Sequence, residues 1–258
     1  MKLFSETTGS GPDLVLVHGW GMNAAVWSPL VERLKSDYRM TVIELPGHGG
    51  SDYDSSAADI DSWARACLDV APETAAWIGW SLGGQIAQRA SVMAPGRIEK
   101  LALVASTPSF VQRDGWPHAM NQNILSQFAK ALVKAPAQTL ERFLSLQVKG
   151  DEEARQTLRL LRQDLALRPD ADPVALEHGL DLLLQVDLRH QLDEIDCPVL
   201  WLLGERDTLV PVGVADELES LHPDADILVL SGCAHAPFLS HPAESIRVLN
   251  TFLGKSNA

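Results

Sequence analysis

The sequence predicts an α/β fold with a mostly parallel, doubly wound sheet and a helical lid insertion. Short apolar runs rich in Val, Ile and Leu recur along the chain, and segments with helical spacing separate most of them. Runs that are apolar throughout are typical of strands buried on both faces, and alternating strands and helices indicate a parallel sheet. Residues 110–192 break this alternation, because they contain helical patterns and no convincing strand.

The expected elements follow one another in chain order. The strands are Leu14–Val17, Thr41–Leu45, Ala75–Gly79, Leu101–Ala105, Val199–Leu203 and Ile227–Leu230. The helices among them include Val26–Lys35, Ile60–Val70, Gln85–Met93 and a closing helix, Pro242–Leu253. The insert contributes Ile124–Val133, Leu140–Val148, Ala154–Leu167 and Val174–Val186. We therefore expect a single domain, with a core of residues 1–109 and 193–258 and a lid of residues 110–192 that covers the site presented by the sheet.

Composition excludes several classes of function. The chain has 258 residues, 46% of them hydrophobic, which is enough for one sizeable core. Its formal charge of -13 disfavours binding to nucleic acid or to an anionic membrane. The first residues lack the pattern of a secretion signal, no apolar run could span a membrane, and Cys67, Cys197 and Cys233 have no spacing typical of zinc or redox sites. We therefore expect a cytoplasmic protein. We also expect a monomer.

The pentapeptide Gly79-Trp80-Ser81-Leu82-Gly83 is the strongest chemical signal in the chain. It lies between an expected strand and an expected helix, the context in which a sharp turn presents a nucleophilic serine. The two glycines permit a strained turn in which larger side chains would collide with the strand and the helix. The alternative is that Ser81 only caps the helix, but the strand, turn and helix together favour a nucleophile.

A serine hydroxyl needs a base, and the base needs a group that orients it. His235 is the favoured base because its loop, residues 231–238, directly follows the last expected strand, and catalytic groups of open α/β sheets gather at the C-terminal ends of strands. His241 is the weaker candidate, since it immediately precedes the closing helix.

For the orienting acid, Asp207 follows the strand Val199–Leu203, with Glu205 as its rival. A simple turn acid is the alternative role for Asp207. The order Ser81, Asp207, His235 is the serine, acid, histidine order of one hydrolase fold, whereas other serine triads run in different orders.

The segment His18-Gly19-Trp20-Gly21 follows the first expected strand and could place the Trp20 backbone N–H beside that of Leu82. Two such donors would stabilise the oxyanion of a tetrahedral intermediate, and the glycines would let the backbone approach a ligand closely. The alternative is an ordinary turn in which His18 is structural and Trp20 belongs to the core. His48, in a second turn at a strand end, is expected to be structural.

These residues resemble the α/β-hydrolase family along nearly the whole chain. Within it, five segments are similar to the family of methyl ester esterases that act on pimeloyl-acyl carrier protein in biotin synthesis. The segments are residues 18–23, 79–84, 141–147, 186–189 and 234–242. The resemblance implies an α/β-hydrolase fold, a triad of Ser81, Asp207 and His235, and an oxyanion hole of Trp20 and Leu82. It also implies that substrate contacts come from Trp20, Ser81, Leu82, Phe143, Leu144, Ser145, Leu146, Gln147 and His235.

The activity implied is two-step acyl transfer that removes the methyl group from a pimeloyl methyl ester carried on acyl carrier protein. Such a mechanism requires no metal and no organic cofactor. Phe143, Leu144 and Leu146 would contact the pimeloyl chain, and packing within the lid is the alternative role for the two leucines.

Charge in the lid offers a second argument. Residues 130–168 contain eight basic and five acidic side chains, a net charge of +3 in a chain of -13. Arg155, Arg159 and Arg162 are spaced to share one helical face, which would attract an acidic carrier protein. A solvated face balanced by local acids is the alternative. In the family, Arg142, Arg155 and Arg159 match arginines implicated in carrier contact, whereas Gln138 stands where a further arginine is expected.

Two other functions remain open at this stage. A broad-specificity esterase for short esters, or a related serine-triad enzyme such as a cofactor-free haloperoxidase or a C–C bond hydrolase, would have the same fold and triad. A ligand receptor on a hydrolase scaffold is the alternative outside enzymes, and the intact set of Ser81, Asp207 and His235 argues against it.

Overall fold

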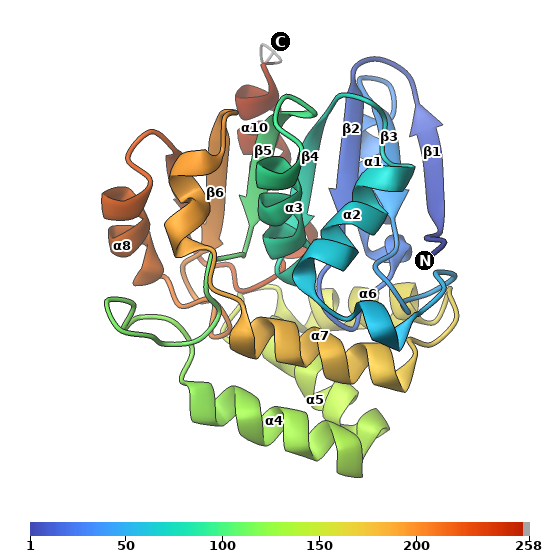
Figure 1. The fold of residues 1–258 in the computed structure, drawn as a ribbon, viewed down its shortest axis with the longest axis vertical. Coiled ribbons are helices and arrows are strands. Elements are labelled where there is room, and N and C mark those ends of the chain that lie inside the picture. Colours follow the sequence, from blue (N-terminus) through green and yellow to red (C-terminus); the bar gives the residue numbers. More distant parts are fainter. Residues whose placement is uncertain (255–258) are drawn as a thin grey trace.

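The computed structural model describes residues 1–254, and its centre is a seven-stranded sheet of order β1-β3-β2-β4-β5-β6-β7 (Figure 1). The strands are β1 (Ser5–Gly9), β2 (Asp13–Val17), β3 (Arg39–Ile43), β4 (Ala75–Trp80), β5 (Ile98–Val104), β6 (Val199–Gly204) and β7 (Asp226–Leu230). Only the β1–β3 pairing is antiparallel. The six expected strands are confirmed with small shifts of their ends, and β1 is an addition at the edge.

Helices cover both the sheet and its C-terminal end. Those of the sheet domain are α1 (Ser28–Leu34), α2 (Ile60–Val70), α3 (Leu82–Met93), α8 (Val214–Leu221), α9 (Pro237–Ser240) and α10 (Pro242–Leu253). Short 3-10 helices cover Ala24–Trp27, Ser55–Ala57 and Arg189–Glu194. Two expected helices are corrected: the one expected at Gln85–Met93 begins at Leu82, directly after the serine, and the one expected at Val26–Lys35 divides into a 3-10 turn and α1.

The insert forms the four expected helices, α4 (Gln122–Lys134), α5 (Pro136–Gln147), α6 (Ala154–Leu165) and α7 (Pro173–Gln185). Figure 1 shows them grouped below the sheet, at the bottom of the view. The helix α4 packs on α5 and α7, whereas α6 packs on α9 and on the 3-10 turn Ala24–Trp27. The insert therefore has an outer part, α4, and an inner part, α6, that rests on the sheet domain. No helix within residues 1–254 is long and apolar enough to cross a membrane.

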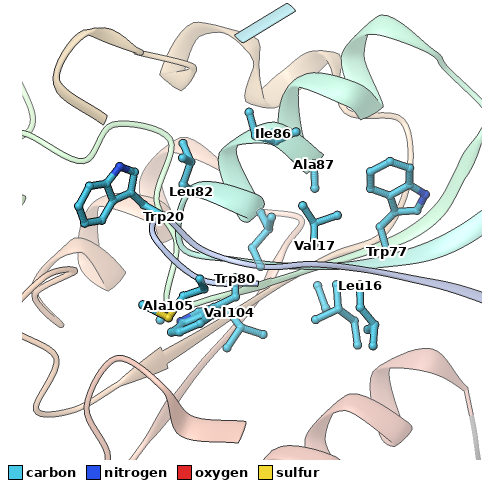
Figure 2. Close-up of a cluster of buried hydrophobic side chains, with 14 of the residues drawn as sticks. Leu16, Val17, Trp20, Trp77, Trp80, Leu82, Ile86, Ala87, Val104 and Ala105 are labelled. Carbon is cyan, nitrogen blue, oxygen red and sulfur yellow. The ribbon is translucent and has the colours of Figure 1, made fainter. Parts of the chain in front are cut away.

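The core fixes the ends of the central strands. Val17 lies opposite Gly79 across β2 and β4, and Trp80 lies opposite Val104 across β4 and β5. In Figure 2, Val17 and Ala87 lie on one side of these strands, and Trp80 lies on the other. Trp80 is fully buried. The turn that follows Trp80 therefore leaves the sheet from a rigid, densely packed base.

Candidate active site

Ser81 occupies a strained turn between β4 and α3, with φ 57° and ψ -122°. Glycines are required around it: a Cβ on Gly79 would lie 2.6 Å from the Gly83 carbonyl oxygen, and one on Gly83 would lie 2.4 Å from the carbonyl oxygens of Val17 and His18. The Ser81 side chain makes no capping hydrogen bond to α3, although it precedes the helix. The hydroxyl is therefore available to another partner, as expected of a nucleophile rather than of a cap.

That partner is His235. Its Nε2 lies 2.9 Å from the Ser81 hydroxyl oxygen, and its Nδ1 lies 2.7 Å from Oδ2 of Asp207. The second carboxylate oxygen of Asp207 accepts the backbone N–H groups of Leu209 and Val210 at 2.8 and 3.0 Å. A carboxylate at Nδ1 holds the proton on that nitrogen, so Nε2 is free to accept the serine proton. All three side chains are buried.

The rival residues make other contacts. Glu205 accepts hydrogen bonds from the Ser231 hydroxyl and the Gly232 backbone N–H. His241 bonds the adjacent Ser240 hydroxyl at the start of α10. The Cys233 thiol donates to the Leu230 carbonyl, and burial raises its pKa to about 12, so it is a packed side chain and not a nucleophile at neutral pH.

The turn of residues 18–21, which is the expected oxyanion turn, passes directly beside the serine, since a Cβ on Gly19 would lie 3.0 Å from the Ser81 Cβ. Within residues 1–254, the backbone N–H groups of Trp20 and Leu82 have no hydrogen-bond acceptor. Two unpaired donors near a nucleophile can hold the negative charge that develops on a carbonyl oxygen during acyl transfer. The structure thus brings both expected donors to the turn around Ser81.

Two buried histidines hold this turn in place. His18 accepts the Leu45 N–H through Nε2 at 3.0 Å and donates through Nδ1 to the Gly19 carbonyl at 2.8 Å. The Gly19 carbonyl and the Trp20 N–H share one peptide plane, so this bond fixes the direction of the donor. His48 accepts the Gly21 N–H at 3.2 Å and bonds the Pro46 carbonyl at 2.9 Å.

Both histidines are neutral, because each ring accepts one backbone N–H and donates to one carbonyl. Burial is the main cause that lowers the pKa of His18 to about 3, with the neighbouring His48 lowering it further. Burial likewise lowers the pKa of His48 to about 4. His48 was expected to be structural, and a structural role for His18 was the alternative considered; in the structure, both side chains hold the turn of residues 18–21.

Trp20 has two separate surroundings. Its indole is fully buried, donates to the Leu176 carbonyl at 2.8 Å and packs edge-on against Phe143 with ring centroids 4.7 Å apart. Its backbone N–H belongs to the oxyanion turn described above. The two alternatives considered for Trp20 thus concern different atoms: the indole is a core side chain, and the backbone N–H is the expected oxyanion donor.

A cavity of about 530 Å³ lies between the lid and the oxyanion turn. Gly21 and Met22 border it on the side of the turn, and Leu140, Phe143 and Leu144 border it on the side of α5. The Ser81 hydroxyl does not line it, and Ser81 is 3% exposed. The Ser81 hydroxyl is therefore closed off from solvent, and the cavity lies beneath the lid on the side of Gly21 and Met22.

The other expected substrate contacts on α5 are placed differently. Ser145 is exposed and donates to the Glu141 carbonyl, and Leu146 is partly buried. Gln147 is buried, its backbone carbonyl accepts the His235 N–H at 3.0 Å, and its side-chain oxygen has no partner within the described chain. Of these three, only Gln147 is in direct contact with the base.

The lid arginines lie on the surface. Arg142, Arg155 and Arg159 are exposed, and none of them makes an ion pair with a residue of the described chain. Arg162 differs, because it pairs with Glu141. Gln138 is exposed on α5 as well. Of the three arginines on the shared face of α6, Arg162 is thus paired with an acidic residue, whereas Arg155 and Arg159 make no ion pair within residues 1–254.

Across residues 1–254, no three His, Cys, Asp or Glu side chains are grouped as ligands for a metal ion.

Comparison with known proteins agrees with this geometry. A model of the alpha/beta hydrolase family matches residues 14–248. The chain is 42% identical to the pimeloyl-[acyl-carrier protein] methyl ester esterase of Aliivibrio salmonicida, over 98% of this chain and 96% of that protein. It is 43% identical to the protein of the same name from Photobacterium profundum, over 96% and 97% of the two chains.

Solved structures show the same fold at lower identity. An esterase from Exiguobacterium antarcticum superposes with a TM-score of 0.88 at 22% identity, over 97% of this chain and 95% of that one. A bromoperoxidase from Bacillus anthracis gives a TM-score of 0.87 at 20% identity, over the same shares. These two proteins have different activities, so the fold alone does not identify the reaction.

Proposed function

Since the chain belongs to the alpha/beta hydrolase family, we propose that it is a serine carboxylesterase that removes the methyl group from pimeloyl-acyl-carrier-protein methyl ester in biotin synthesis. The observation that carries the proposal is the pair of hydrogen bonds from His235 to Ser81 and Asp207, in a chain similar over nearly its full length to esterases of that name. We propose that it acts as a cytoplasmic monomer. One chain supplies all the groups of the site, namely the side chains of Ser81, Asp207 and His235 and the N–H groups of Trp20 and Leu82.

In the first step, Nε2 of His235 takes the proton of the Ser81 hydroxyl as its oxygen attacks the ester carbonyl. The Trp20 and Leu82 N–H groups stabilise the oxyanion of the tetrahedral intermediate. The imidazolium then gives its proton to the methoxy oxygen, and methanol leaves. Asp207 stabilises the positive charge and keeps the ring oriented throughout.

In the second step, water attacks the acyl-serine with His235 as the base. The collapse of the second tetrahedral intermediate returns the proton to Ser81 and releases the free carboxylate. The same two backbone donors serve both intermediates, because the carbonyl oxygen occupies one position in each.

The lid supplies the substrate contacts in this proposal. The cavity bordered by Phe143 and Leu144 suits an apolar chain, since it lies beside the oxyanion turn and is lined mainly by apolar side chains. Ser81 is 3% exposed, so part of the lid must move to admit the ester. Arg142, Arg155 and Arg159, which make no ion pair within residues 1–254, form the surface on which an acidic carrier protein would dock.

Methanol release tests the proposal. The purified protein would be incubated with pimeloyl methyl ester attached to acyl carrier protein, and methanol would be quantified against time. We expect release with the wild type and none with Ser81→Ala. No methanol from the wild type, with a folded protein, would refute the proposed reaction.

A further inference from the structure

The lid is bonded directly to the loop of the proposed base. The His235 N–H donates to the Gln147 carbonyl at 3.0 Å, and the Glu152 N–H donates to the Gly232 carbonyl at 3.2 Å. These two backbone bonds join the segment between α5 and α6 to the loop after β7. That segment is 80 residues or more from the loop in sequence, so the lid and the base meet only in the folded protein.

Asp151 makes the third bond of this junction, and among residues 1–254 it is the one that uses a side chain. Its Oδ2 accepts the Ala234 N–H at 2.8 Å, and its Oδ1 accepts the Glu153 N–H at 2.7 Å. Asp151 is 8% exposed. A carboxylate that bonds two backbone N–H groups forms charge-assisted bonds, which are shorter and stronger than neutral ones.

We propose that Asp151 is a positioning residue for the proposed base: its carboxylate ties the start of α6 to Ala234, and so holds the His235 imidazole against Ser81. The proposal rests on the proposed function, because it gives His235 the role of base. Asp151 itself does not reach the reacting atoms. It acts through the peptide that precedes His235.

The opposite side of the loop is already fixed, which is why Asp151 can control its position. The Arg206 N–H donates to the Cys233 carbonyl at 2.9 Å, and a Cβ on Gly204 would lie 2.2 Å from the Ala234 carbonyl oxygen. The loop is therefore held between the segment that carries Asp207 and the segment that carries Asp151. Loss of the Asp151 carboxylate removes one of the three bonds on the lid side, and leaves the buried Ala234 N–H without its acceptor.

The position of α6 makes this junction relevant to carrier docking. Arg155 and Arg159 lie in the first two turns of α6, shortly after Asp151, which precedes the helix. At the other end of α6, the Leu165 carbonyl accepts the Asn23 side-chain amide at 3.1 Å, two residues beyond the oxyanion turn. The helix proposed to receive the carrier is thus bonded at one end beside the base and at the other end beside the oxyanion turn.

Steady-state kinetics on a short p-nitrophenyl ester tests the proposal, because that substrate needs no carrier docking. For Asp151→Ala we expect kcat to fall about tenfold or more with little change in KM, since small displacements of catalytic groups cost large factors in rate. The rising limb of the pH profile of kcat/KM should also shift, because that limb reports the ionisation of the base in the free enzyme. Asp151→Asn keeps one acceptor oxygen and should recover part of the loss.

Asn121→Ala is the matched control. Asn121 caps the lid helix α4 through its side chain, with its Oδ1 2.9 Å from the Asn123 N–H, and its amide nitrogen donates to Oε1 of Gln112 at 3.2 Å, so neither bond reaches the loop of His235. It should lose stability but keep the wild-type kcat and pH profile. If folded Asp151→Ala keeps both as well, the proposal is overturned.

If Asp151→Ala fails to fold, Asp151→Asn tests the proposal in its place. A reduced kcat of Asp151→Asn would support the proposal, and a wild-type kcat and pH profile would overturn it. If the wild type has no esterase activity at all, the proposed function fails instead. The two failures are therefore distinguishable.

Discussion

The indole Nε1 of Trp80 donates a 2.7 Å hydrogen bond to the backbone carbonyl of His235. Trp80, the residue before Ser81, thus holds the loop at the carbonyl of His235, whereas Gln147 holds it at the His235 N–H. The rings of Trp80 and His235 also lie 5.9 Å apart between centroids. The spacing between Ser81 and His235 is therefore set partly by their immediate neighbours in sequence and not only by their own side chains.

Trp80→Phe should lower kcat about tenfold on any ester, because it removes this donor and leaves a buried carbonyl without its partner. The protein should also unfold about 1 to 2 kcal/mol more easily. Esterase kinetics and urea unfolding measure the two effects. An unchanged kcat would show that the hydrogen bond does not position His235.

Ser81→Ala should abolish ester hydrolysis while the circular dichroism spectrum stays unchanged, because the hydroxyl is the only group lost and the turn geometry is kept by Gly79 and Gly83. Substantial remaining turnover would mean that another group is the nucleophile. Covalent labelling by a fluorophosphonate gives an independent readout, since the wild type should be labelled and the variant should not.

Arg155→Glu combined with Arg159→Glu should reduce kcat/KM on the carrier-bound ester far more than on a short p-nitrophenyl ester. The two side chains are exposed and unpaired in the described chain, so their reversal changes the surface potential and leaves the triad in place. Lys130→Glu with Lys134→Glu is the matched control, because it makes the same change of charge on α4. Equal losses on both substrates would contradict docking on α6.

Stability should fall as the pH drops from 7 to 5. His18 and His48 have pKa values lowered to about 3 and about 4, so between pH 6.5 and 4 the unfolded chain binds protons that the folded protein does not. Asp164 opposes them, because burial raises its pKa to about 6 and the folded protein takes up a proton there. The imidazoles of His18 and His48 against one carboxyl leave a net loss of unfolding free energy on the order of 2 kcal/mol. His222, whose pKa is also lowered by burial, adds to this loss.

Urea unfolding at pH 7 and at pH 5 measures this difference. Asp164→Asn should make the pH dependence steeper, since it removes the opposing group. Equal unfolding free energies at the two pH values would show that the buried histidines are not held neutral.

Much of the fold could be predicted because the buried strands are apolar throughout. The strand β1 was missed, since Ser5–Gly9 is a mostly exposed edge strand with no apolar run. The start of α3 was placed too late because Gly83 and Gly84 suggest a turn, whereas the helix uses them for close packing against His18 and Ser106. The helix α8 was also not predicted.

The site was predictable where chemistry restricts residue type and not where it depends on distant contacts. Ser81, Asp207 and His235 follow strand ends in a recognisable order, and the structure brings their side chains together. Asp151 carries no such signal, because the Ala234 N–H that it binds is 83 residues away. That hydrogen bond forms only because the lid packs on the sheet domain in the folded protein.

The most direct measurement of the central claim is the mass of the carrier protein bearing the pimeloyl methyl ester, before and after incubation with the enzyme. The account predicts that the carrier loses the mass of one methylene unit, as a methyl ester becomes a free carboxylic acid, and that the thioester to the carrier stays intact. An unchanged mass, or release of the whole acyl chain from the carrier, would contradict it.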